Sequence, residues 1–231
     1  MVSDINFLLV GNSRLHWAKY SKDQSKFFHT KKNQKVPENI DLDKLIWASV
    51  GELPNFWLKG ENEIKTKDIK LSNLPDYFGV DRALACLAAL NIISNPLKKD
   101  LLIADFGTIL SITKLNSNGT VIGGQLIPGF LTQLKSMEKS TKNLKIPKKY
   151  DVPNKDFLMS TDEATLKGVI NSLTGVIYST FNPLKDILIT CGGDSQFLTK
   201  LLDTHTNYIN NSPNLVMEGM IIHHLSRNKL F

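Results

Sequence analysis

The sequence has little cysteine and no long hydrophobic run. Cys86 and Cys191 are the two cysteines among 231 residues, and neither has the spacing of a metal-binding pair. A disulfide framework is therefore not expected, and a reducing, cytoplasmic setting is favoured. The longest apolar runs are too short to span a membrane. The chain starts directly in a strand pattern, without a basic, cleavable leader, so we expect no signal peptide and no membrane partner.

Acidic residues are outnumbered by basic ones, which gives a net charge of +6. The lysines are scattered or occur in short pairs, without the interleaved aromatic residues typical of nucleic-acid modules. A mildly basic surface also suits a small anionic substrate such as ATP, so we do not expect a nucleic-acid partner. Hydrophobic residues make up 42% and charged residues 22%, which is ordinary for a globular protein with a real core.

One short pattern occurs twice, once in each half of the chain. Residues 7–10 form an apolar run that leads into Gly11-Asn12-Ser13, and residues 101–106 lead into Gly107-Thr108. A second strand-like run follows each of these turns. Each copy predicts a hairpin whose turn presents backbone N–H groups to an anion. Two such hairpins could hold the phosphates of a nucleotide.

The remaining pattern alternates strands and helices. Apolar runs predict further strands near residues 45–50, 120–124 and 187–190, and residues 127–129 are expected to be a loop. Helical spacing predicts four helices: residues 79–90, a segment through 131–137, a long helix after residue 160, and a last helix reached through a strand or turn near residue 214. We therefore expect an α/β protein with two similar halves, residues 1–98 and 99–231, and a ligand cleft between them.

The second hairpin offers groups suited to phosphate chemistry. Asp105 at the strand end can hold a cation, Gly107 lets a phosphate approach the backbone, and Thr108 adds a hydroxyl donor. A plain hairpin with a turn glycine is the alternative. The first hairpin has Leu9 where the second has Asp105, so it keeps hydrogen-bonding residues but has no carboxylate for Mg²⁺.

Gly79-Val80-Asp81-Arg82 at a predicted helix start is a second candidate site. Phosphoryl transfer to an alcohol needs a carboxylate near the attacking hydroxyl. A planar guanidinium can bind an acidic group of the substrate through two parallel hydrogen bonds. Alternatively, Asp81 only caps the helix and Arg82 is solvated.

Two later motifs have strong structural explanations. Ser160 and Glu163 have the spacing of a capping box at a helix start. Gly192-Gly193-Asp194 follows a buried strand and fits either a loop on which a nucleobase lies or a plain strand-to-helix turn.

Taken in order, these motifs resemble the type III pantothenate kinase family of the acetate and sugar kinase/Hsc70/actin superfamily. The resemblance covers nearly the whole chain. In the first half, Gly11-Asn12-Ser13 resembles the end of the family pattern D-x-G-N-T, and Gly79-Val80-Asp81-Arg82 matches G-x-D-R. In the second half, Asp105-Phe106-Gly107-Thr108 matches D-x-G-T, and Gly123-Gly124 with Pro128-Gly129 matches G-G-x-x-x-P-G. Further along, Ser160-Thr161-Asp162-Glu163-Ala164 resembles S-T-x-E-A, and Cys191-Gly192-Gly193-Asp194 resembles T-G-G-D.

The resemblance implies an actin-like ATPase fold with two ribonuclease-H-like halves, and ATP-dependent phosphorylation of pantothenate, the first step of coenzyme A synthesis. It implies that Asp81 is the base and that Gly79, Val80, Arg82 and Thr161 also contact the substrate. Gly11, Asn12, Ser13, Arg14 and Thr108 would contact ATP, which carries Mg²⁺, and Asp105 would bind K⁺ or NH₄⁺. The family's homodimer would place Thr161 in the active site of the partner subunit.

Two departures from the family pattern keep other functions open. Leu9 replaces the aspartate of the first loop, which suggests a non-catalytic, regulatory relative as an alternative. The tyrosine usually found before G-x-D-R has no clear match, Tyr77 being the nearest aromatic residue, which suggests a kinase for another small hydroxy acid or a sugar.

Overall fold

The chain forms two compact units in a computed structural model that describes residues 4–22, 24–56, 58–93, 98–202 and 209–227. Unit 1 consists of residues 1–98, 115–122 and 214–231, and unit 2 of residues 99–114 and 123–213. The chain first passes from one unit to the other between residues 98 and 99, and its last helix returns to unit 1.

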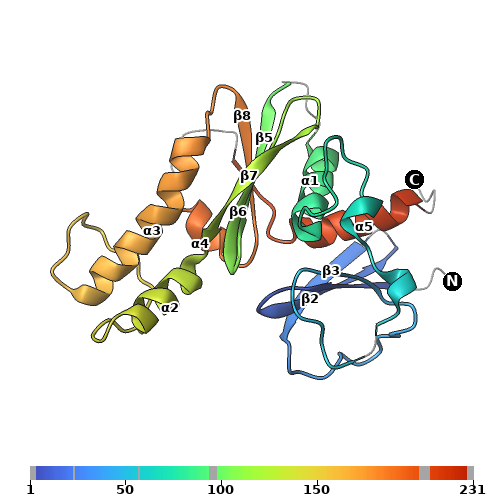
Figure 1. Cartoon of the computed structure of the whole chain (residues 1–231), viewed down its shortest axis with the longest axis horizontal. Coiled ribbons are helices and arrows are strands. Elements are labelled where there is room, and N and C mark those ends of the chain that lie inside the picture. The colour runs from blue at the N-terminus through green and yellow to red at the C-terminus, as the bar shows by residue number, and fades with distance from the viewer. Residues whose placement is uncertain (1–3, 23, 57, 94–97, 203–208, 228–231) are drawn as a thin grey trace. The chain divides into compact units, whose positions relative to one another are not determined.

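Unit 1 is built on a four-stranded sheet (Figure 1). Its strands are β1 (Ile5–Val10), β2 (Arg14–Ser21), β3 (Gln24–Lys31) and β4 (Ile46–Ser49), in the order β3-β2-β1-β4. β1 pairs antiparallel with β2 and parallel with β4, and β2 pairs antiparallel with β3. The confirmed β1–β2 hairpin is the first of the two predicted from the sequence.

Helices α1 (Val80–Ile92) and α5 (Leu215–Arg227) pack on one another in unit 1. They approach closely because Gly219 has no side chain: a Cβ atom there would overlap the Leu84 carbonyl oxygen. The Phe7 ring of β1 meets His224 of α5 edge-on, with the centroids 5.7 Å apart. This face of the sheet is therefore covered by helix, with the alanine-rich, buried side of α1 in the core.

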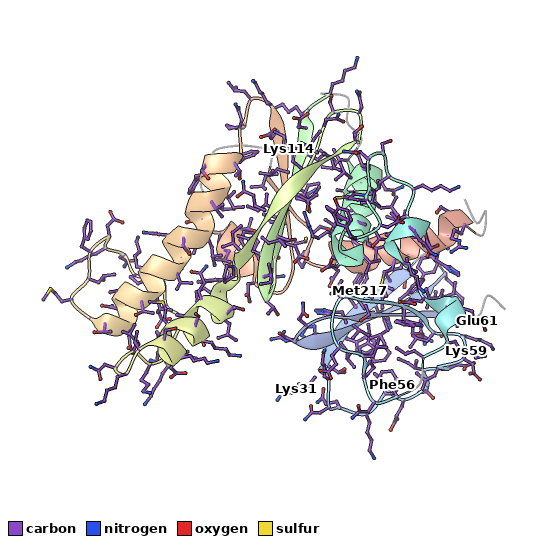
Figure 2. All side chains as sticks on the ribbon, viewed as in Figure 1. Lys31, Phe56, Lys59, Glu61, Lys114 and Met217 are labelled. Atoms are coloured by element: carbon purple, nitrogen blue, oxygen red, sulfur yellow. The ribbon has the colours of Figure 1, made fainter. Side chains whose placement is uncertain are left out.

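The other face of the sheet carries a small aromatic core. Trp17 and Trp47 are buried there with Leu8 of β1, and Phe56 stacks on Trp17 at 6.3 Å (Figure 2). The segment that follows β4 contains two short 3-10 helices, η1 (Gly60–Asn62) and η2 (Thr66–Asp68).

Unit 2 has a five-stranded sheet with helices packed on it. Its strands are β5 (Asp100–Phe106), β6 (Ile109–Leu115), β7 (Val121–Pro128), β8 (Asp186–Cys191) and β9 (Ile209–Asn211), in the order β7-β6-β5-β8-β9. The core packs strand residues against α2 (Phe130–Ser140), α3 (Thr161–Thr180) and α4 (Ser195–Thr199).

The two sheets share one strand order. β3-β2-β1-β4 in unit 1 corresponds to β7-β6-β5-β8 in unit 2, and in both units the fourth strand pairs parallel with the first. The α/β class with two ribonuclease-H-like halves is therefore confirmed. The parallel partners β4 and β8 end beside the hairpin turns, which places further loops next to those turns.

Two details of the chain differ from the sequence prediction. β3 was not expected, because most of its residues are exposed and its sequence does not alternate between apolar and polar. β7 continues through Ile127 and Pro128, which were expected to be a loop. The last helix, α5, is reached through a turn at residues 213 and 214, as expected. Among the described residues, no helix is long and apolar enough to cross a membrane.

Candidate active site

The first turn, residues 11–13, is held by backbone hydrogen bonds at the end of β1. The Gly11 N–H donates to the Arg14 carbonyl at 3.0 Å, which closes the hairpin. The Val10 carbonyl accepts from the N–H groups of Val50 at 3.0 Å and Gly51 at 3.1 Å, just after β4. A Cβ atom at Gly51 would overlap the Gly11 carbonyl oxygen, so only glycine fits there. Asn12, Ser13 and Arg14, which follow on this fixed backbone, are exposed.

The second turn, residues 107–108, is fixed by the start of α2. The Gly107 N–H donates to the Ile109 carbonyl at 3.3 Å. The Thr108 carbonyl accepts from the Gly129 N–H at 3.0 Å and from the Thr132 hydroxyl at 2.6 Å. A Cβ atom at Gly129 would overlap the Gly107 carbonyl oxygen. The D-x-G-T and P-G motifs, 20 residues apart in the sequence, thus meet in space.

Asp105 and Gly192 lie side by side at the ends of the parallel strands β5 and β8. Gly192 has a φ of +88°, and a Cβ atom there would overlap the Asp105 carboxylate and lie 2.7 Å from the Phe106 carbonyl oxygen. The Asp194 N–H donates to that same carbonyl at 3.0 Å. By strand register Gly192 corresponds to Ser49, because Asp105 pairs with Cys191 as Leu9 pairs with Ala48. The hydrogen bond from Asp194 to the Phe106 carbonyl corresponds to the one from Gly51 to the Val10 carbonyl, so the repeat extends to this backbone contact.

Asp81 lies in the first turn of α1 and is half-buried. Gly79, which has no side chain, is the N-cap residue of this helix. The Asp81 carboxylate accepts the backbone N–H of Arg82 at 2.7 Å. Burial raises the pKa of Asp81, and the hydrogen bond from Arg82 opposes this shift only in part. A half-buried carboxylate with a raised pKa is a better proton acceptor than an exposed one.

Arg82 points to an aromatic ring rather than into open solvent. Its Cζ atom lies 4.0 Å from the centroid of the Phe78 ring. Burial lowers the pKa of Arg82, yet the guanidinium remains charged near neutral pH. Cys86, one turn further along α1, is fully buried, and burial raises the pKa of its thiol to about 12. This cysteine is therefore a neutral core residue and not a nucleophile.

Leu9 occupies the position in unit 1 that Asp105 has in unit 2. It is 6% exposed and lies opposite His16 in the β1–β2 pair. Burial, together with the positive charges of His29 and Arg14, lowers the pKa of His16 to about 4. The imidazole is therefore neutral near neutral pH, and the first turn has neither the carboxylate nor a charged histidine behind it.

Thr161 is the first residue of α3 and is exposed. The Ser160 hydroxyl accepts the Glu163 N–H at 3.5 Å, which gives the N-cap half of the expected capping box. This end of α3 lies at the far end of unit 2 from the β5–β6 turn (Figure 1). Phe157 and Met159, just before it, are 94% and 102% exposed.

Some predicted residues are thus brought together and others are not. Unit 2 gathers Asp105, Thr108, Gly129 and Gly192 at one edge of its sheet, whereas Thr161 lies apart from them. Sequence reasoning missed the supporting role of Gly51, although a glycine directly after a buried strand was the available signal. In the described part of the chain, no three His, Cys, Asp or Glu side chains are grouped so that they could hold a metal ion.

Comparison with known families gives a consistent result. The family model for type III pantothenate kinase matches residues 52–182. The chain is 29% identical over 237 residues to a type III pantothenate kinase of Synechocystis sp., covering 95% of this chain and 90% of the relative. It is 26% identical over 239 residues to a second one from Synechococcus elongatus, covering 92% and 93%.

Solved structures support the fold. A conserved Baf family transcriptional activator from Campylobacter jejuni aligns with a TM-score of 0.67 at 20% identity, covering 98% of this chain and 100% of that one. An activator of 2-hydroxyisocaproyl-CoA dehydratase from Clostridium difficile with bound ADPNP aligns at 0.55 and 10% identity, covering 98% of both chains. At these identities the likeness concerns the fold alone.

Proposed function

Because the chain belongs to the type III pantothenate kinase family, we propose that it transfers the γ-phosphoryl group of ATP to the primary hydroxyl of pantothenate, with Asp81 as the general base. The observation that carries this assignment is the pairing of Asp81 with Arg82 at the start of α1, inside the region that the family model matches. The protein is a kinase of the actin-like ATPase fold.

Asp81 would accept the proton of the attacking hydroxyl as the oxygen forms its bond to the γ-phosphorus and ADP leaves. The raised pKa that burial gives this carboxylate favours proton transfer. Arg82, three residues after the helix N-cap Gly79 and positively charged, would bind the carboxylate at the other end of pantothenate. Gly79 and Val80 complete the substrate-binding segment.

The two turns are suited to the phosphates of ATP. Each places exposed polar residues at the end of a strand: Asn12, Ser13 and Arg14 in unit 1, and Thr108 in unit 2. Gly11 and Gly107 allow a phosphate to approach the backbone. Mg²⁺ would arrive with ATP and neutralise phosphate charge.

Asp105 would hold the monovalent cation, K⁺ or NH₄⁺. The Asp105 carboxylate and the Phe106 carbonyl oxygen both lie against Gly192, and oxygen atoms of this kind suit a hard cation. The end of β5 carries this acid, whereas the corresponding position at the end of β1 is Leu9. When bound, the cation would supply positive charge next to the second turn.

Thr161 would act in the active site of a partner subunit. It lies away from the second turn of its own chain, and the exposed Phe157 and Met159 beside it provide apolar surface for a homodimer interface. The buried thiols of Cys86 and Cys191 are not joined in a disulfide, which supports the proposed cytoplasmic location.

The test is an assay of pantothenate phosphorylation by the purified protein with ATP and Mg²⁺, in K⁺, NH₄⁺ and then Na⁺. Turnover that requires K⁺ or NH₄⁺ is expected. Absence of turnover in every cation, from a folded protein, would contradict the proposal and would favour another hydroxy-acid substrate or the non-catalytic role that Leu9 suggests.

A further inference from the structure

Phe78 lies directly before the Gly79-Val80-Asp81-Arg82 segment, and its ring packs against Arg82. The Cζ atom of Arg82 is 4.0 Å from the ring centroid, within the range of a cation–π contact. A guanidinium held against an aromatic face has less freedom to reorient than one in open solvent. The ring therefore restricts the position of the Arg82 side chain.

The backbone of Phe78 is fixed on both sides. Its N–H donates to the Pro75 carbonyl at 3.0 Å. Its carbonyl accepts the hydroxyl of Thr66 at 2.6 Å, and Thr66 is itself buried. A ring on such an anchored backbone is a stable platform, whereas the preceding residue, Tyr77, is 91% exposed.

Gly79 brings the two functional side chains together above this platform. A Cβ atom at Gly79 would lie 2.7 Å from the Asp81 carboxylate and 3.7 Å from Cδ of Arg82. Both side chains therefore pass close to the backbone of Gly79, and the Arg82 N–H donates to Asp81. Any shift of the guanidinium would alter its placement relative to the carboxylate.

We propose that Phe78 is a positioning residue that orients the Arg82 guanidinium toward the carboxylate of the substrate, and so makes the enzyme select an acid over its neutral analogues. This inference rests on the proposed function, because it assigns the contact to the acid end of pantothenate. Phe78 lies outside the Gly79-to-Arg82 segment, and its role is to make substrate binding depend on the negative charge of the substrate.

The test compares two substrates in three proteins. Pantothenate and its neutral primary amide are assayed with the wild type, Phe78→Leu, which removes the aromatic face, and Phe78→Tyr, which keeps it. We expect Phe78→Leu to raise the KM for pantothenate about tenfold, the size of a partly desolvated cation–π contact. The KM for ATP and the KM for the amide should change little, and Phe78→Tyr should restore the wild-type preference.

Phe28→Leu is the matched control, because Phe28 stacks on Trp17 in the same unit and lies on β3 instead of before α1. It should leave the ratio of the two substrates unchanged. Equal losses for both substrates in Phe78→Leu, or no recovery in Phe78→Tyr, would overturn the role of Phe78 while leaving the kinase assignment intact. A wild type that neither binds nor phosphorylates pantothenate would overturn the proposed function and this inference with it.

Discussion

Leu9 and His16 face each other across the antiparallel β1–β2 pair, at the end of the sheet next to the first turn. His16 is neutral there, since burial and the nearby positive groups lower its pKa from 6.5 to about 4. A hydrophobic residue and an uncharged imidazole are mutually compatible in such a place. An aspartate at position 9 would instead put a carboxylate beside a histidine.

His16 should make the protein sensitive to acid. Below pH 6.5 the unfolded chain binds a proton at this histidine that the folded chain binds only near pH 4, so stability falls as the pH drops through this window. Between about pH 7.5 and about pH 5 the loss due to His16 is about 2 kcal/mol. Urea unfolding at both pH values should show that His16→Gln loses less stability than the wild type. The exposed His29, changed to Gln, is the control and should retain most of the acid sensitivity.

Leu9→Asp should raise the pKa of His16, because a carboxylate across the strand pair favours the imidazolium. It should also lower the free energy of unfolding by about 1–3 kcal/mol, since position 9 is buried. NMR titration of the His16 ring protons measures the pKa directly. Leu9→Asn has the same shape without the charge and should leave the pKa low. An unchanged His16 pKa in Leu9→Asp would contradict the contact between the two residues.

Asp81→Asn should reduce kcat about 10²- to 10⁴-fold, because it removes the proton acceptor while preserving shape. In the wild type, kcat/KM should fall on the acid side as Asp81 becomes protonated. Burial raises the pKa of this carboxyl, so the midpoint should lie above the 3.8 of an ordinary aspartate. The control is Asp76→Asn, an exposed aspartate in the same segment, which should behave as the wild type. An active Asp81→Asn enzyme would remove Asp81 from the mechanism.

The sequence was sufficient to predict what depends on local pattern. The β1–β2 and β5–β6 hairpins and the long buried helices follow from apolar periodicity and turn residues. β3 could not be predicted, because it is an edge strand stabilised by pairing with β2 and not by its own apolar face.

The missed features of the candidate site are long-range contacts. Gly51 is required only because its backbone meets the first turn, and Phe78 matters only because its ring meets Arg82. Neither contact has a sequence signature in a single chain. The motif residues themselves could be named because each stands at a strand end or a helix start, positions that the local sequence pattern locates.

Lys114 of β6 joins the starts of two other strands in unit 2 (Figure 2). Its Nζ atom is 2.9 Å from the Asp186 carboxylate, which is 1% exposed, and 3.3 Å from that of Asp100. Asp186 also accepts the Asn182 N–H at 2.8 Å. Lys114→Met would leave a buried carboxylate without its cation.

The loss should be about 2–3 kcal/mol in urea unfolding followed by circular dichroism, because breaking a buried pair is costly and Lys114 is partly exposed. Adding Asp186→Asn to Lys114→Met should recover part of it, since no charge then remains buried. The exposed pair of Lys44 and Asp41 provides the control: Lys44→Met should cost less than about 1 kcal/mol. Equal effects of the two lysine variants would show that the buried pair has no special role.

Gly192 and Gly193 are neighbours with opposite structural demands. Gly192 has a φ of +88° and no room for a Cβ atom beside Asp105 and Phe106, whereas a Cβ atom at Gly193 would meet no other atom within 4 Å. Gly192→Ala should therefore lower the free energy of unfolding by at least about 2 kcal/mol, from backbone strain and displaced neighbours. Gly193→Ala should change it by less than about 0.5 kcal/mol.

The same pair of variants tests the cation site. If Asp105 binds the monovalent cation, Gly192→Ala should raise the K⁺ concentration needed for half-maximal turnover, because the new methyl group pushes the carboxylate away from the Phe106 carbonyl. Gly193→Ala should leave that concentration unchanged. A Gly192→Ala enzyme that is destabilised but keeps the wild-type K⁺ requirement would separate the two roles. The glycine would then be needed for the fold of the second turn, and the cation would have to be held by groups other than Asp105.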